Sequence, residues 1–155
     1  AFYDDPALVR ALLEVITATY IAFMRRWEQL APPAGDHTVH WGIWQKGRIM
    51  IRNDSAMNLS PEMYAEFSVP YDQRLLDIFG GTIHACGRVD HYIEELSRIR
   101  GLTGVNISQP ELNDMEKVFV HTVDKGIRHI NLFRSGITDA LARHRPLRGL
   151  VHVVG

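Results

Sequence analysis

Short apolar, strand-like runs alternate with helical patterns along most of this chain, and this alternation constrains the fold more than any other feature. Strand-like runs are expected at residues 82–86, 104–107, 127–133 and 150–154. Helical patterns occupy the intervening segments at 90–100, 111–125 and 135–144. Such alternation is typical of parallel strands that are joined by helical crossovers. We therefore expect an α/β fold built on a parallel sheet.

The first half of the chain opens with a long helix. Asp5 is placed to cap it, and the apolar positions that follow repeat at helical spacing to about Gln29. Residues 37–54 read either as two strands with a turn at Lys46-Gly47 or as one interrupted strand. Ser60-Pro61 marks the start of a second helix, which we expect to kink or restart at Pro70 and to end at Gly80-Gly81.

The short, regularly spaced strands favour a (β/α)8 TIM barrel over an open, doubly wound sheet. A complete barrel takes about 250 residues, whereas this chain has 155 residues and four or five strands. We therefore expect a single domain, residues 1–155, that forms about half of such a barrel, with parallel strands and crossover helices. A half barrel leaves two open sheet edges. Either the chain is a fragment, or a second copy covers the edges and makes a homo-oligomer.

The charge balance and the single cysteine exclude several kinds of protein. Lys and Arg number 17 and Asp and Glu number 18, so no broad positive field favours nucleic acid or an anionic membrane. We find no apolar run near the roughly 20 residues of a membrane helix and no signal-peptide pattern, and we expect a cytoplasmic protein. Cys86, as the only cysteine, excludes an intrachain disulfide and an all-cysteine metal site within one chain.

Polar residues follow three of the expected strands, where parallel α/β folds build their active sites. The three segments are Asn53-Asp54-Ser55, His84-Ala85-Cys86-Gly87 and Asn106-Ile107-Ser108-Gln109-Pro110. Each comes after an apolar strand and before a helix signal. This coincidence makes the three strand ends the expected site of chemistry, with His84-Ala85-Cys86-Gly87 as its principal segment.

His84 and Cys86 are two residues apart on a strand, so their side chains point to the same face. An imidazole and a thiolate are suitable zinc ligands, and a catalytic zinc commonly has three protein ligands and one open position. A third ligand is therefore required. The other interpretation of this pair is structural, with a small buried cysteine beside a hydrogen-bonded histidine.

The remaining candidates each have two interpretations. Asp54 is either a strand-end carboxylate in the cavity or the start of a turn with its neighbours. Asn106 and Gln109 either bind polar groups of a substrate or hydrogen-bond the loop backbone. His91 lies just after the principal segment, at a helix start, and is a secondary candidate. We find no phosphate-binding glycine loop, dinucleotide fingerprint or serine-nucleophile elbow.

These segments resemble the uroporphyrinogen decarboxylase superfamily between about Asp5 and Gln109. The resemblance rests on Asp54-Ser55, Leu59-Ser60-Pro61-Glu62-Met63-Tyr64-Ala65-Glu66-Phe67, Pro70-Tyr71, Ile83-His84-Ala85-Cys86-Gly87, Asn106 and Gln109-Pro110. Their order and spacing are similar to those of the C-terminal half of that barrel. The superfamily includes heme-pathway decarboxylases and zinc-dependent methyltransferases that act on methylcobamides and thiols.

The His-x-Cys-Gly segment resembles the methyltransferase branch. The resemblance implies that His84 and Cys86 bind zinc, which activates a substrate thiol for attack on a corrinoid-bound methyl group. A corrinoid co-substrate, a corrinoid protein as partner and a small thiol substrate are implied with it. Family methyltransferases supply a further cysteine near the C-terminus, which this chain lacks, so Asp54 and His152 are the candidates for the third ligand.

Our leading hypothesis is therefore an enzyme segment for zinc-assisted methyl transfer. Asp54, His84 and Cys86 are its catalytic residues, His84 and Cys86 its metal ligands, and Asn106 and Gln109 its substrate-binding residues. A second hypothesis is a metal-free decarboxylase, a lyase of porphyrin metabolism that acts on a tetrapyrrole or another carboxylated substrate. A third, of a different class, is a non-catalytic or self-associating half barrel.

Overall fold

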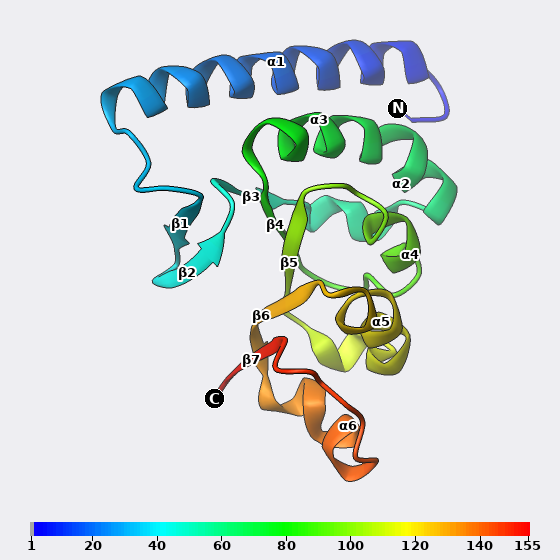
Figure 1. Ribbon diagram of the computed structural model, residues 1–155. Coiled ribbons are helices and arrows are strands. Elements are labelled where there is room, and N and C mark those ends of the chain that lie inside the picture. The colour runs from blue at the N-terminus through cyan, green and yellow to red at the C-terminus, as the bar shows by residue number, and fades with distance from the viewer. Residues whose placement is uncertain (1) are drawn as a thin grey trace.

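A five-stranded parallel sheet forms the centre of the molecule in the computed structural model, which describes residues 2–155 (Figure 1). Each strand lies beside the one that follows it in sequence. The strands are β3 (Ile49–Arg52), β4 (Gly81–Ala85), β5 (Leu102–Ile107), β6 (Arg128–Phe133) and β7 (Val151–Val154). The expected α/β fold with a parallel sheet is confirmed. β3 and β7 are its end strands, so the described residues form an open sheet.

The crossovers between these strands are helical, and Figure 1 shows α4, α5 and α6 on one side of the sheet. The helices are α2 (Pro61–Phe67), α3 (Val69–Phe79), α4 (Ile93–Leu96), α5 (Met115–His121) and α6 (Thr138–Ala142). Short 3-10 turns accompany them: η1 (Asp54–Asn58), η2 (Pro110–Leu112), η3 (Val123–Lys125) and η4 (Arg134–Ile137). Ser60 caps α2 by accepting a hydrogen bond from the Met63 amide, as the sequence predicts.

Two helices are shorter than their sequence patterns suggest. The segment expected to be helical from Asp90 to Arg100 forms only the four residues of α4, because the Asp90 carboxylate bonds Arg88 and the Asp114 amide. The expected helix at 111–125 is divided into η2, α5 and η3. Asp114 accepts hydrogen bonds from the Glu116 and Lys117 amides, so it starts a new helix in the middle of that segment.

Residues 37–46 form an antiparallel hairpin of β1 (His37–His40) and β2 (Ile43–Lys46). Its turn is Trp41-Gly42, where both residues have positive φ, as a two-residue hairpin loop requires. The expected turn at Lys46-Gly47 instead connects the hairpin to the parallel sheet. A Cβ on Gly47 would overlap the backbone of Gly81, so glycine is needed for this close approach. The hairpin lies on the opposite side of the sheet from α4, α5 and α6 (Figure 1).

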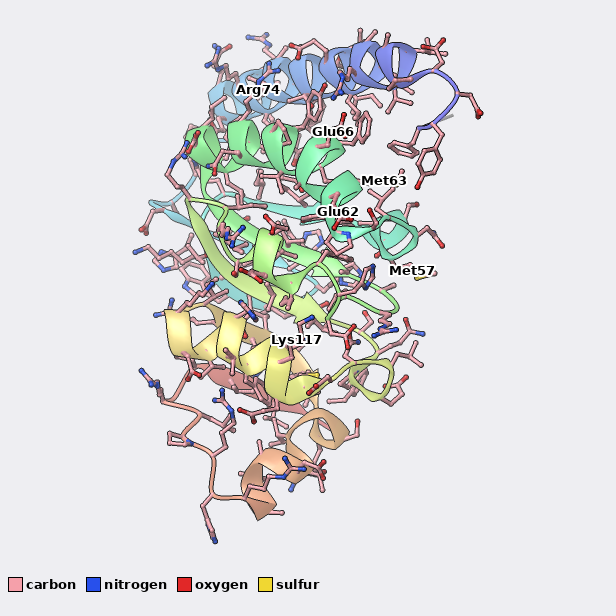
Figure 2. The ribbon with its side chains drawn as sticks, turned by 90° about the vertical axis from the view of Figure 1, so that its right-hand side faces the viewer. Met57, Glu62, Met63, Glu66, Arg74 and Lys117 are labelled. Carbon is pink, nitrogen blue, oxygen red and sulfur yellow. The ribbon has the colours of Figure 1, made fainter. Side chains whose placement is uncertain are left out.

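Helix α1 (Pro6–Leu30) begins at the expected cap, since the Leu8 amide donates to the Asp5 carboxylate. Its charged side chains form ion pairs with the body of the protein: Arg10 with Glu66, Glu14 with Arg74, and Glu28 with Arg48. Glu66 and Arg74 are labelled in Figure 2 below α1. The opposite face exposes large apolar side chains: Leu8, Leu12, Val15, Ile16, Phe23, Trp27 and Leu30.

By length and composition α1 is sufficient to cross a membrane, although the sequence analysis counted no run of this kind. The same test is passed by core helices of soluble proteins and by N-terminal signal sequences. Only 11% of its most apolar window is buried in the fold.

The core lies between the sheet and its helical layer. Burial of its large apolar side chains supplies the main stabilising free energy of the fold. The most completely buried members are Tyr64, Leu76, Ile83, Tyr92, Ile93, Leu96, Val105, Ile107, Phe119 and Leu132. Because the core fixes α2, α3 and β4 against one another, the carboxyl ends of β3, β4 and β5 are held at one edge of the sheet.

Candidate metal centre

Three strand ends meet where the sequence predicts a site. In the parallel register Arg52 of β3 lies beside His84 of β4, and His84 lies beside Asn106 of β5. Asp54 begins η1 directly after β3, and Cys86 follows β4. The parallel order of the sheet therefore brings residues from three separate segments of the chain into one cluster.

Asp54, His84 and Cys86 form a compact group of potential metal ligands. Asp54 Oδ1 lies 3.1 Å from His84 Nε2, and Cys86 Sγ lies 3.5 Å from the same nitrogen. The three donor atoms all lie within 4.8 Å of one another. His84 is buried, Cys86 is half-buried and the Asp54 side chain is 53% exposed, so the group opens to solvent on the Asp54 side.

Asn106 determines which nitrogen of the His84 ring faces Asp54 and Cys86. Its Oδ1 lies 2.6 Å from His84 Nδ1, while its Nδ2 donates to the Ile130 carbonyl at 2.6 Å. Because the amide nitrogen is used by Ile130, the oxygen is left to accept from Nδ1–H of His84. The lone pair of a neutral ring is then on Nε2, the atom that faces Asp54 and Cys86. Metal-binding histidines commonly have this arrangement.

The contact between His84 Nε2 and Asp54 has two physical explanations. A neutral ring and a carboxylate would place two acceptors 3.1 Å apart, which is unfavourable unless a cation lies between them. A protonated ring would instead form an ion pair with Asp54. The first explanation corresponds to a metal centre and the second to a structural histidine, and a measurement of bound metal distinguishes them.

The electrostatics at Cys86 favour the thiol. Burial raises the pKa of the Cys86 thiol, and the neighbouring Asp54 carboxylate raises it further, although a hydrogen bond with Ser108 acts in the opposite direction. In the absence of a cation Cys86 is therefore a poor nucleophile at neutral pH. A divalent metal would reverse this preference, because a coordinating thiol is deprotonated.

The side-chain amides of the other two predicted residues, Asn106 and Gln109, are hydrogen-bonded within the protein. Gln109 Oε1 accepts a hydrogen bond from the Gly87 amide at 2.5 Å, so this side chain connects the loop after β5 to the loop after β4. Both ends of the Asn106 amide are used by His84 and Ile130. His91 Nε2 lies 2.9 Å from the Leu59 carbonyl. The His91 ring therefore packs the loop after β4 against the connection between η1 and α2.

Two residues near His84 were not predicted. Trp41, at the tip of the hairpin, has its ring edge against His84, with centroids 4.8 Å apart and planes at 84°. The Arg52 guanidinium lies over the Trp41 ring at 4.6 Å, and its Nη2 is 2.7 Å from His40 Nε2. Nothing in the spacing of the sequence indicates these contacts, because they depend on how the hairpin folds over the sheet.

A buried carboxyl group lies next to the segment that connects β3 to η1. Asp72 of α3 accepts a hydrogen bond from Asn53 Nδ2 at 2.7 Å, and the Asn53 amide donates to the His84 carbonyl at 2.9 Å. Burial raises the pKa of Asp72 to about 7, although its bonds with Asn53 and Tyr64 act to lower it. Asn53 is thus held by Asp72 through its side chain and by the His84 carbonyl through its backbone amide, and these two bonds fix the start of η1.

A cavity of about 870 Å³ adjoins the cluster and is lined by Arg52, Asn53, Asp54 and Ser55 together with residues of α2 and the N-terminal segment. Its size suits a small-molecule ligand. Asp54 is the member of the metal-ligand group that lines it. A ligand in this cavity would therefore approach the cluster from the carboxylate side.

Comparisons of the chain with protein-family models, with curated proteins and with solved structures give no match. Nitrogen, sulfur and oxygen donors from a histidine, a cysteine and an aspartate are all ligands that zinc accepts, and three of them leave one position of a tetrahedral zinc for a substrate. The residues present fit a catalytic rather than a closed structural zinc site.

Proposed function

We propose that this chain is a segment of a TIM-barrel enzyme of the uroporphyrinogen decarboxylase type whose chemistry is zinc-assisted methyl transfer from a corrinoid to a thiol. The observation that carries the proposal is the convergence of Asp54, His84 and Cys86, with their ligand atoms within 4.8 Å of one another. In this proposal the open parallel sheet is half of the barrel. The reaction assigned to it depends on the resemblance of the His-Ala-Cys-Gly segment to the methyltransferase branch.

Each residue has a defined role in this proposal. His84 Nε2, Cys86 Sγ and an Asp54 carboxylate oxygen hold the metal, and Asn106 orients the His84 ring. Zinc at this position supplies a Lewis acid that lowers the pKa of a substrate thiol and so provides a thiolate nucleophile. Trp41 covers the His84 ring and limits the access of water on that side.

Asp54 is assigned as the third ligand in place of the C-terminal cysteine of the family. His152 was the other candidate, and it lies on β7 beside a different cavity, outside the group of three. Trp41 and Arg52 lie near His84 but do not cover Asp54, whose side chain is 53% exposed. A thiol substrate would reach the open position through the cavity that Asp54 lines.

The first experiment measures zinc by elemental analysis in protein that is purified without chelator. We expect about one zinc per chain, most of it lost in Cys86→Ser and in Asp54→Ala. His121→Gln removes an imidazole from α5, outside the cluster, and serves as the matched control with full zinc content. Absence of zinc in the wild-type protein, or unchanged zinc content in both cluster variants, overturns the metal centre.

The second experiment mixes the zinc-loaded protein with methylcobalamin and 2-mercaptoethanol and follows the formation of cob(I)alamin and the methyl thioether. The sulfur–carbon bond forms as the cobalt–carbon bond breaks, its electron pair remains on cobalt, and the thiol proton goes to solvent. We expect turnover that Cys86→Ser abolishes. Zinc binding without turnover would retain the metal centre and overturn methyl transfer. Chelator-insensitive decarboxylation of a porphyrinogen would support the lyase alternative.

A further inference from the structure

A second cavity lies on the face of the sheet that the hairpin covers. It has a volume of about 800 Å³ and is bounded by β2, by the start of β5, by β6 and by β7. None of Asp54, His84 and Cys86 lines it. We propose that this cavity binds an aromatic carboxylate, as a ligand site separate from the metal centre.

The cavity wall provides positive charge and no negative charge. Lys46 and Arg128 are among its lining residues, and none of the lining residues is an aspartate or a glutamate. Lys46 lies 4.0 Å from Asp36, whereas Arg128 has no ion pair or hydrogen-bond partner for its side chain among residues 2–155. A carboxylate in the cavity would supply that partner, and a guanidinium binds it with two parallel hydrogen bonds.

Gln45 adds an unused donor in the same wall. The residue is only 3% exposed, and its Oε1 accepts a hydrogen bond from Thr82 Oγ1 at 2.5 Å. Its Nε2 is buried and has no hydrogen-bond partner within the described part of the chain. A buried amide nitrogen without a partner costs about 1–3 kcal/mol, so a rotation of the Gln45 side chain that brings Nε2 to an acceptor in the cavity would be favourable.

The rest of the wall suits a flat apolar ring. Trp41 and Trp44 both line the cavity and are 51% and 65% exposed. The Trp44 ring is stacked on His37 with centroids 5.3 Å apart, which fixes its orientation. Volumes of about 300–1,000 Å³ are typical of small-molecule sites whose walls are mainly apolar with a few polar groups.

The backbone of β6 departs from regular geometry at this cavity. Asn131, a lining residue, has a positive φ of 52°, and the register between β6 and β7 shifts between His129 and Leu132. Irregularities of this kind are frequent beside binding sites, where they redirect a side chain. The structure thus combines an aromatic wall, a free guanidinium, a buried amide donor and a distorted strand in one place.

The test uses 2-naphthoate and its neutral analogue 2-naphthamide, titrated separately into the protein by isothermal titration calorimetry. We expect 2-naphthoate to bind at least about tenfold more tightly than the amide, because only the acid pairs with Arg128. Arg128→Gln should remove this difference, and Gln45→Leu should weaken 2-naphthoate. Arg25→Gln, which removes an exposed charge from α1, is the matched control and should leave both affinities unchanged.

Equal affinities for the acid and the amide, or an unchanged 2-naphthoate affinity in Arg128→Gln, would overturn the proposal. Arg128 is exposed, so its variant is informative even if Gln45→Leu does not fold. The titrations are repeated in Cys86→Ser protein. Because that variant lacks a ligand of the metal centre, retained 2-naphthoate binding in it shows that the two sites are independent.

Discussion

The carboxamide oxygen of Asn106 lies 2.6 Å from Nδ1 of His84, and this contact between neighbouring strands determines which ring nitrogen faces the cluster. The amide nitrogen of Asn106 is bound to the Ile130 carbonyl, so the group cannot rotate without losing that bond. The candidate metal centre is therefore oriented by β5 and β6, although its ligands come from β4 and from the segments that follow β3 and β4. A substitution at Asn106 tests this dependence without removing a ligand.

Asn106→Ala should weaken zinc binding by about 10- to 100-fold, the usual effect of removing the group that orients a histidine ligand. Competition with a chromophoric chelator measures the affinity. Asn106→Asp keeps an oxygen for Nδ1–H but loses the donor to the Ile130 carbonyl, so its zinc affinity should lie between those of Asn106→Ala and the wild-type protein. Wild-type affinity in Asn106→Ala would show that the ring is oriented by packing against Trp41 alone.

A second prediction concerns Asn113, which connects the two loops beside the cluster. Its Oδ1 accepts from the Val89 and Asp90 amides at 2.7 and 3.0 Å, and its Nδ2 donates to the carbonyls of Gly87 and Gln109. Asn113→Ala removes the partner of the Val89 and Asp90 amides and of the Gly87 carbonyl, whereas the Gln109 carbonyl still accepts from the Leu112 amide. We therefore expect the free energy of unfolding to fall by about 2 kcal/mol or more in denaturant titrations.

Asn58→Ala is the matched control for Asn113→Ala. The Asn58 amide is exposed and makes a single bond, to the Ser55 carbonyl. We expect a loss within about 0.5 kcal/mol, as is usual for surface substitutions. Equal losses in the two variants would contradict the role of Asn113 in the loops.

A third prediction follows from Asp72. Its pKa in the fold is about 7 against an ordinary value of 3.8, so between these values the folded protein holds a proton that the unfolded chain releases. The free energy of unfolding should therefore fall as pH rises through this window, by up to about 1.4 kcal/mol per unit, and should level off above pH 7. Asp72→Asn keeps an acceptor for Asn53 and removes the titration.

The comparison of Asp72→Asn with the wild-type protein isolates this effect. The melting temperatures should be similar near pH 5, where the wild-type carboxyl is protonated, and the variant should be the more stable protein at pH 8. A constant difference in melting temperature across this range would mean that Asp72 does not titrate there. Asp77→Asn replaces an exposed aspartate of the same helix and serves as the control.

The placement of the site could be predicted because it follows from topology. Once the alternation of strands and helices indicates a parallel sheet, Asp54, His84 and Asn106 must lie at one edge, since each follows or ends a strand. The same rule makes no prediction about Trp41, because the contact of Trp41 with His84 depends on a two-residue hairpin turn with positive φ. The sequence pattern offered a turn at Lys46-Gly47 or one interrupted strand, whereas the structure has its hairpin turn at Trp41-Gly42.

Helix boundaries were less predictable for a different physical reason. Asp90 and Asp114 are both capping residue types, yet Asp114 caps α5 and the Asp90 carboxylate accepts from the Asp114 amide. Local propensity would place Asp90 at a helix start, but its carboxylate is used in the tertiary contact between the two loops. Gln45 and Asn113 were missed similarly, because a buried amide has no signature in periodicity.

The last prediction concerns His129, a buried residue of β6. Its Nε2 is 2.8 Å from Thr122 Oγ1, and its ring packs edge-on against Phe119. Burial lowers the pKa of His129 to about 3 from an ordinary value of 6.5. Below pH 6.5 the unfolded chain binds a proton that the folded protein does not. Stability should therefore fall by up to about 1.4 kcal/mol per unit as pH decreases toward 3.

His129→Gln keeps a donor for Thr122 and removes the titrating ring. We expect the variant to be less stable than the wild-type protein at pH 7, because the Phe119 contact is lost, and to lose less stability between pH 7 and pH 4. Urea titrations at both pH values give the two differences. His121→Gln, on the surface of α5, should follow the wild-type pH dependence. The same pH dependence in His129→Gln and the wild-type protein would show that His129 becomes protonated without unfolding.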